Sequence, residues 1–166
     1  MPATYEKIAT TTLGSSQSSI TFNSIPNTYT DLKLIFTQIG TTTDTSARLI
    51  FSSDNNTNYS QTSIRGDGSN AASSRVTDRT YIFVMFWSGL SNSTQPLFWD
   101  FNVFSYANST NKTILFTSSQ DTNGAGVVAR DVALWRNTSA ITSLTLTSNN
   151  NFASGTTATL YGILKA

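Results

Sequence analysis

Apolar and polar residues alternate with a period of two along most of this chain. Leu32, Leu34 and Phe36 occupy every second position of one segment. Ile20 and Phe22 alternate with polar neighbours in the same way. Successive side chains of a β-strand point to opposite faces, so this period indicates strands with one buried face. A sustained apolar stripe with helical spacing is missing from the sequence, which therefore predicts an all-β fold.

Nine segments of this kind follow one another, separated by residues that favour turns. They cover 19–25, 31–39, 47–51, 79–87, 96–107, 112–117, 127–136, 141–147 and 156–165. This spacing is typical of β-sandwiches and barrels. We expect a single domain over 18–166, an antiparallel two-sheet β-sandwich with jelly-roll connectivity. The last two segments are expected to pair as a hairpin.

Three segments do not fit the strand pattern. Residues 1–17 lack alternation beyond Tyr5 and Ile8, so we expect an N-terminal arm that reaches onto a neighbouring subunit. The polar segments 52–78 and 118–126 are expected to be long loops. Binding sites of β-sandwiches are commonly found on such loops.

The side chains available for catalysis are few. The chain has 24 serines, 28 threonines and 15 asparagines, which together fill 67 of 166 positions, and it has no histidine and no cysteine. The residues most often used as general bases, thiol nucleophiles and metal ligands are therefore absent. We expect a protein that is not an enzyme and binds neither a metal nor a cofactor.

The charges are sparse and nearly balanced. Only 11% of residues are charged, and the formal net charge is +1. The basic residues are scattered, so no nucleic-acid partner is expected. The apolar stretch 81–87 is too short to span a bilayer as a helix, and the first seven residues do not resemble a secretory signal. Low net charge favours association with other protein surfaces.

A glycan hydrolase is the enzyme class that the sequence leaves open. Such an enzyme needs two carboxyl groups flanking its substrate. Asp100 is the one carboxylate within an aromatic-rich strand segment, and most others lie in expected turns. Asp100 is therefore the candidate for this alternative.

One polar segment resembles the beginning of a calcium-binding loop. Asp54, Asn56 and Asn58 have the spacing of the first oxygen ligands of such a loop. Tyr59 and Arg65 stand where the loop requires glycine and glutamate. An asparagine-rich turn is the preferred interpretation.

The tripeptide Arg65-Gly66-Asp67 is one that cell-adhesion receptors bind. Because Gly68 follows it, a glycine-rich turn is the preferred interpretation. If a host-surface glycan binds this region, the candidate ligand loop comprises Asp54, Asn56, Asn58, Tyr59, Arg65 and Asp67.

Large aromatic side chains are the remaining candidates for a role. They could form a platform that stacks on sugars, but a sandwich core and a subunit interface need such residues too. We expect core or interface positions for most of them, and solvent exposure is of most interest for Tyr59, Trp87 and Trp135. The candidate interface comprises Tyr5, Ile8, Trp87, Trp99, Trp135, Leu160 and Tyr161.

Four segments resemble a group of tailed-bacteriophage virion proteins. They are Tyr5–Gly14, Ser19–Pro26, Tyr29–Leu34 and Ala158–Leu164, which together frame the whole chain. The resemblance implies a β-rich surface component present in many copies. It implies either a capsid decoration (cement) protein, typically a trimer placed over junctions of the shell, or a tail, fibre or spike component.

The leading hypothesis is a capsid decoration protein that binds the major capsid protein and stabilises the shell through contacts between subunits. It would be assembled in the host cytoplasm and reside on the particle surface. The alternative is a tail- or fibre-associated module whose loops 52–78 and 118–126 bind a receptor or host glycan. Neither hypothesis involves nucleic acid or a membrane.

Overall fold

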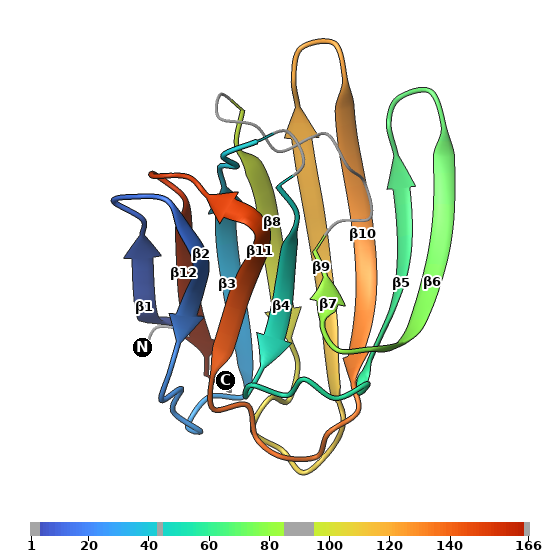
Figure 1. Cartoon of the computed structure of the whole chain (residues 1–166). Coiled ribbons are helices and arrows are strands. Elements are labelled where there is room, and N and C mark those ends of the chain that lie inside the picture. The colour runs from blue at the N-terminus through green and yellow to red at the C-terminus, as the bar shows by residue number, and fades with distance from the viewer. Residues whose placement is uncertain (1–3, 43–44, 85–94, 165–166) are drawn as a thin grey trace.

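The described part of the chain consists of strands, turns and irregular segments. The structure is a computed structural model that describes residues 4–42, 45–84 and 95–164. Two antiparallel sheets of eight and four strands face each other, and neither closes into a barrel (Figure 1). The prediction of an all-β, two-sheet sandwich is confirmed.

The larger sheet has the strand order β1-β12-β3-β8-β9-β10-β5-β6. Its strands are β1 (Tyr5–Thr12), β12 (Thr157–Ile163), β3 (Asp31–Gln38), β8 (Leu97–Val103), β9 (Lys112–Asp121), β10 (Gly126–Trp135), β5 (Tyr59–Gly66) and β6 (Ala71–Arg79). Every neighbouring pair is antiparallel.

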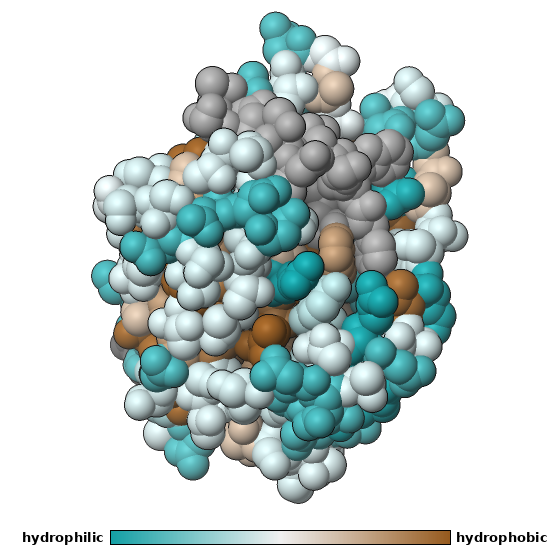
Figure 2. Space-filling view, in the orientation of Figure 1, coloured by the Kyte–Doolittle hydropathy of each residue, from teal (hydrophilic) through white to brown (hydrophobic). Residues whose placement is uncertain are grey.

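The smaller sheet has the strand order β2-β11-β4-β7. Its strands are β2 (Gln17–Phe22), β11 (Leu144–Phe152), β4 (Ala47–Phe51) and β7 (Ile82–Phe83). The side of the molecule that carries this sheet is mainly polar in Figure 2. On it, the hydroxyls of Thr21 and Thr145 lie 3.2 Å apart across two strands.

The core lies between the sheets and is made by the alternating residues. Leu32, Leu34 and Phe36 of β3 are fully buried, as their spacing predicts. From the smaller sheet, Leu144 and Leu146 meet this layer. Each fully buried side chain of this size contributes about 1.5–3 kcal/mol through the hydrophobic effect.

The N-terminal segment is part of the larger sheet, which corrects the expectation of an arm. Residues 5–12 form β1, which pairs with β12 from Tyr5–Ile163 to Thr12–Thr157. A β-bulge at Ile8 obscures the alternation of apolar and polar residues in the sequence, because one extra residue moves the following side chains to the opposite face of the strand. Ile8 also packs against the core, so its side chain points into this subunit.

The last two strands do not form the expected hairpin. β11 belongs to the smaller sheet and β12 to the larger one, so the segment 153–156 crosses between the sheets. Gly155 has a φ of 87° in this crossing, a conformation that glycine adopts without strain. Residues 149–152, which lie between the two expected segments, continue β11, so the turn is shorter than expected and both flanking strands pair with other strands.

The two segments expected as long loops are mostly strand. β5 pairs with β6, and β9 pairs with β10, as two hairpins whose tips project past the top of the sandwich in Figure 1. The prediction failed at β5 because this strand buries polar side chains, Gln61 and Ser63, on its inner face. The apolar alternation that marks a strand is therefore missing there.

Candidate binding face

The candidate ligand loop is divided between opposite ends of β5. At one end, Asp54 is 9% exposed and its carboxylate is fully engaged. Its Oδ1 accepts hydrogen bonds from the backbone and side-chain nitrogens of Asn56, at 3.0 and 2.7 Å. Its Oδ2 accepts from Asn58 Nδ2 at 2.9 Å and from Trp135 Nε1 at 2.7 Å. The segment is an asparagine-rich turn, as the sequence favoured.

These donors change the acidity of Asp54. Burial acts to raise the pKa of the carboxyl group, but the hydrogen bonds from Asn58, Asn56 and Trp135 outweigh it. The pKa falls from 3.8 to about 2. Asp54 therefore stays ionised and is held inside the fold rather than presented to a ligand.

Tyr59 is buried, contrary to the expectation of an exposed ligand contact. Its ring stacks on Trp135 with centroids 6.3 Å apart, and its hydroxyl accepts a hydrogen bond of 3.0 Å from the backbone nitrogen of Phe51. Burial raises the pKa of this hydroxyl. Tyr59 lies on the inner face of β5, so its side chain belongs to the core.

At the other end of β5, the adhesion-type tripeptide leads into the tip of a hairpin, with Arg65 and Gly66 in the strand and Asp67 in the turn. Asp67 Oδ1 accepts hydrogen bonds from the backbone nitrogens of Ser69 and Asn70, at 2.9 and 2.6 Å. Gly68 has a φ of 88°, which the tight turn requires. Arg65 is half-buried on β5. The carboxylate thus stabilises the turn that the sequence predicted.

Three candidate interface residues are core residues instead. Trp99, Trp135 and Leu160 are fully buried within this chain, because each faces the smaller sheet from an inner position of its strand. They are not available to a partner without unfolding. Size and aromaticity marked them correctly as packing residues but did not indicate which surface they pack against.

The other interface candidates have different surroundings. Tyr5 is 53% exposed at the edge of the larger sheet, and Tyr161 is half-buried beside Lys33 in the register of β12 and β3. Ile8 packs against the core. Trp87 lies outside the described residues. Tyr5 and Tyr161 therefore remain as surface positions.

The larger sheet presents a broad face away from the smaller sheet, which we call the outer face. No described strand covers it, because all twelve belong to the two sheets. Four large apolar side chains stand exposed on it: Ile64 at 61%, Val128 at 60%, Val132 at 44% and Phe98 at 43%. Exposed apolar residues gathered on one face typically mark an interaction surface.

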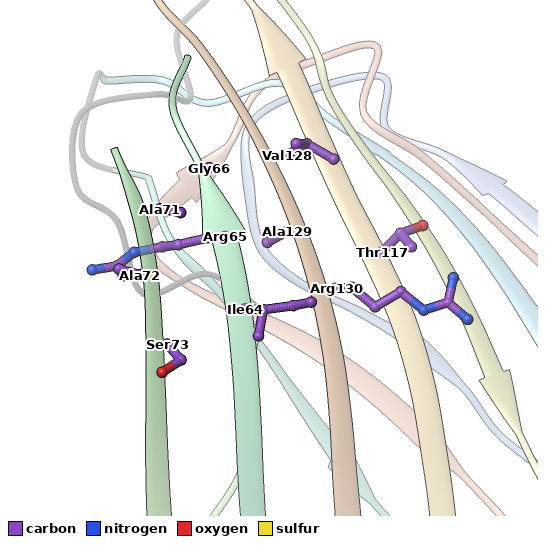
Figure 3. Close-up of a pocket in the computed structure, with 10 residues that line it drawn as sticks. All are labelled: Ile64, Arg65, Gly66, Ala71, Ala72, Ser73, Thr117, Val128, Ala129 and Arg130. Carbon is purple, nitrogen blue, oxygen red and sulfur yellow. The ribbon is translucent and has the colours of Figure 1, made fainter. Parts of the chain in front are cut away.

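A hollow of about 660 Å³ lies on this face across the hairpin strands (Figure 3). Ile64 and Val128 flank it, while Gly66 and Ala71 leave space between them. Gly66 pairs with Val128 on one side and with Ala71 on the other. Small residues between larger ones make the hollow shallow and apolar.

Charged groups lie in the middle of the outer face. Lys33 Nζ donates to Asp100 Oδ1 at 2.6 Å and to Asn102 Oδ1 at 3.3 Å. Arg130 lies on β10 and leans across β9 toward Thr117 in Figure 3. Within the described residues, Arg130 forms no ion pair. The outer face therefore combines apolar contacts with charges of both signs.

The hydrolase alternative gains no support from these positions. Asp100, its candidate carboxylate, forms the ion pair with Lys33. Among the residues that the structure describes, no three histidine, cysteine, aspartate or glutamate side chains come together as a possible metal site. The described residues also include no helix that could cross a membrane.

Asp131 lies on the inner face of β10 in the larger sheet, and only 5% of the residue is exposed. Ser63 Oγ and Gln61 Nε2 both donate to its Oδ1, the latter at 2.8 Å. Burial raises the pKa of Asp131 against the effect of these two hydrogen bonds. No described lysine or arginine forms an ion pair with it.

Replacing Asp131 with asparagine is therefore expected to stabilise the protein at neutral pH. Because the pKa of Asp131 is raised in the folded state, its protonated carboxyl group stabilises the fold at pH values below the unfolded-state pKa. This stabilisation is lost as the pH rises through the folded-state pKa. Asp131→Asn should raise the melting temperature at pH 7 by about 2–4 °C, roughly 1 kcal/mol, and flatten its dependence on pH. Differential scanning calorimetry from pH 3 to 8 measures this, and a lower melting temperature at pH 7 would show the carboxylate to be stabilising.

Comparisons of the chain with protein-family models, curated proteins and solved structures find no match. The outer face and the order of the strands are therefore the features from which a function can be inferred.

Proposed function

We propose that this chain is a non-enzymatic structural protein of a tailed-phage virion, and that it serves as a capsid decoration protein. In this role it binds the major capsid protein, acts in many copies and stabilises the shell by burying surface between subunits. The observation that carries the proposal is the outer face, which no described strand covers and which has four exposed apolar side chains around a charged centre. Such a surface fits protein–protein packing better than catalysis.

The order of strand pairing also supports the proposal. β1 pairs with β12, β2 with β11, β3 with β8 and β4 with β7. Nested pairing of this kind supports jelly-roll connectivity, with the hairpins β5–β6 and β9–β10 as insertions that widen one sheet. Jelly rolls are common in capsid and lectin domains. Since one fold supports many functions, this likeness adds to the argument from the face and does not replace it.

The proposal predicts that the chain is a component of purified particles. Phage particles from a culture that carries the gene would be banded twice on a density gradient, and quantitative mass spectrometry would compare this chain with the major capsid protein. We expect a fixed ratio that survives the second banding and corresponds to many copies per particle. A ratio that falls toward zero on rebanding would contradict the proposal.

A second candidate function is a tail- or fibre-associated module that binds a receptor or a host glycan. The projecting hairpin tips at 67–70 and 122–125 favour it, because they extend past the sandwich and carry polar side chains. A glycan array is the direct test. Binding that is lost when the tip 122–125 is replaced by a two-residue turn would support this candidate, and an array without binding would remove it.

A further inference from the structure

We propose that the outer face packs against the outer face of a second copy of this chain, about a two-fold axis that runs along β9. This inference rests on the proposed function and assigns the outer face to the contact between copies, so that the pair contacts the shell through its remaining surfaces. In such a pair, β8 of one copy lies over β10 of the other, β3 over β5, and β12 over β6. Facing sheets normally align their strands within about 30°, which this arrangement satisfies.

The charges are placed symmetrically about the axis. Thr117 on β9 pairs with Asp100 on one side and with Arg130 on the other. A rotation about β9 therefore brings Asp100 of each copy opposite Arg130 of the other. Two ion pairs form in this way, and Arg130, which forms none within the described chain, gains a partner in both copies.

The apolar residues follow the same symmetry. Ile35 pairs with Asp100 and Ile64 pairs with Arg130, so Ile35 of each copy meets Ile64 of the other. Leu115 lies on β9 and faces its own counterpart near the axis. Both copies use the same surface patch in this contact, which is therefore isologous. Isologous contacts are the commonest kind in homodimers.

Phe98 of one copy and the hollow of the other also come together under this rotation. Phe98 and Val128 both pair with Ser119 of β9, from opposite sides. The rotation therefore places the protruding Phe98 ring beside Val128 and the hollow at Gly66 of the second copy. A projecting aromatic ring meets a depression formed by small residues, which is the packing that central interface contacts show.

The size of the face sets the expected affinity. Seven strands spaced about 4.8 Å apart, over roughly 20 Å of their length, give a flat area on the order of 600 Å² per copy. Stable interfaces bury about 800 Å² per partner, so the dimer belongs to the weaker end of the range. We expect a dissociation constant on the order of 10 μM. β1 has no counterpart across the axis and lies outside the contact.

Sedimentation velocity of the purified chain, from about 1 to about 200 μM, tests the inference. The wild type should pass from monomer to dimer across this range. Arg130→Asp opposes like charges at two sites and should raise the dissociation constant at least about tenfold. Leu115→Lys, with two cations near the axis, should do the same. Melting temperatures of all variants check that they fold.

Two further proteins make the test specific. The double variant Asp100→Arg with Arg130→Asp restores opposite charges across the axis and should recover the dimer. Lys7→Asp makes the same kind of charge reversal on β1, outside the contact, and should leave dimerisation unchanged. Recovery in the first and no change in the second would support the assigned axis.

A wild type that stays monomeric, a trimer, or a dimer that tolerates both Arg130→Asp and Leu115→Lys would overturn the inference. These outcomes are separate from the test of the proposed function. A monomer that is present at a fixed ratio in banded particles would leave the virion role supported, and a dimer that is absent from particles would contradict that role alone.

Discussion

Replacing Trp135 with alanine is expected to lower the free energy of unfolding by about 3–5 kcal/mol, because a fully buried indole leaves a cavity. The ring contacts Tyr59 and Phe51, with centroids 6.3 and 5.7 Å away. Lys112 Nζ lies 5.9 Å from the ring centroid. One substitution thus removes the centre of an aromatic cluster.

Lys112 adds to this effect because it is a buried cation. Its Nζ donates hydrogen bonds to backbone oxygens of Asn108 and Asn137, at 2.7 and 3.3 Å, and also to that of Thr110. Burial lowers the pKa of Lys112. Loss of the Trp135 indole removes the cation–π contact of Lys112 and lets water reach the Lys112 ammonium group.

Chemical denaturation with tryptophan fluorescence and circular dichroism measures the change at Trp135. Trp135→Phe is the matched variant, since it keeps a ring and loses the hydrogen bond from Nε1 to Asp54. It should lose clearly less stability than Trp135→Ala. Equal losses in both variants would mean that the hydrogen bond, and not the filled volume, dominates.

The second large effect is expected at Asp54. Each carboxylate oxygen of Asp54 accepts two hydrogen bonds, so the NH2 group of Asp54→Asn leaves two donors without their acceptor, either both from Asn56 or those from Asn58 and Trp135. The expected loss is about 2–4 kcal/mol at pH 7, measured by urea denaturation. A loss below about 0.5 kcal/mol would contradict the assigned network.

The pH dependence follows from the lowered pKa of Asp54. Since the folded-state pKa is about 2 and the ordinary value is 3.8, folding favours the ionised form. The stability from this group is complete above the ordinary value and is lost as pH falls toward 2. It amounts to about 2 kcal/mol. Asp54→Asn should therefore remove that part of the decline between pH 5 and pH 2, and an unchanged decline would assign it to other carboxylates.

A double-mutant cycle with Trp135→Phe and Asp54→Asn connects the two predictions. The side chains share one hydrogen bond of 2.7 Å, so their effects should not add. A coupling of about 1–3 kcal/mol is expected for a buried bond to a charged group. Additive losses would show that the two residues act independently.

Local periodicity was sufficient to predict much of the sandwich. Leu32, Leu34 and Phe36 were placed in the core by spacing alone, and all three are fully buried. The turn at Asp54 was also recognised, because aspartate and asparagine form side-chain hydrogen bonds with nearby backbone groups. These features depend on a few neighbouring residues, which a sequence displays directly.

Other features depend on contacts between distant segments. Lys112 is a charged residue in the core, and only the carbonyl groups that surround it make its burial acceptable. Gln61 and Ser63 face inward because Asp131 accepts their hydrogen bonds. No local sequence pattern indicates that a polar residue is buried in this way, so β5 was expected as part of a loop.

The outer face could not be found from the sequence for the same reason. Asp100, Thr117 and Arg130 lie in one row only because of the registers of β8 with β9 and of β9 with β10. Ile64 joins the row through β5. Each residue alone is an ordinary strand residue, and the face exists only once the strands are paired.

Single-particle cryo-electron microscopy of the rebanded phage tests the central claim most directly. We expect density for a two-sheet sandwich with two projecting hairpins, repeated over the shell lattice and in contact with the major capsid protein. Density confined to the tail or its fibres would contradict the capsid role and favour the receptor-binding alternative. Particles whose shell and tail both lack the sandwich would contradict the virion assignment itself.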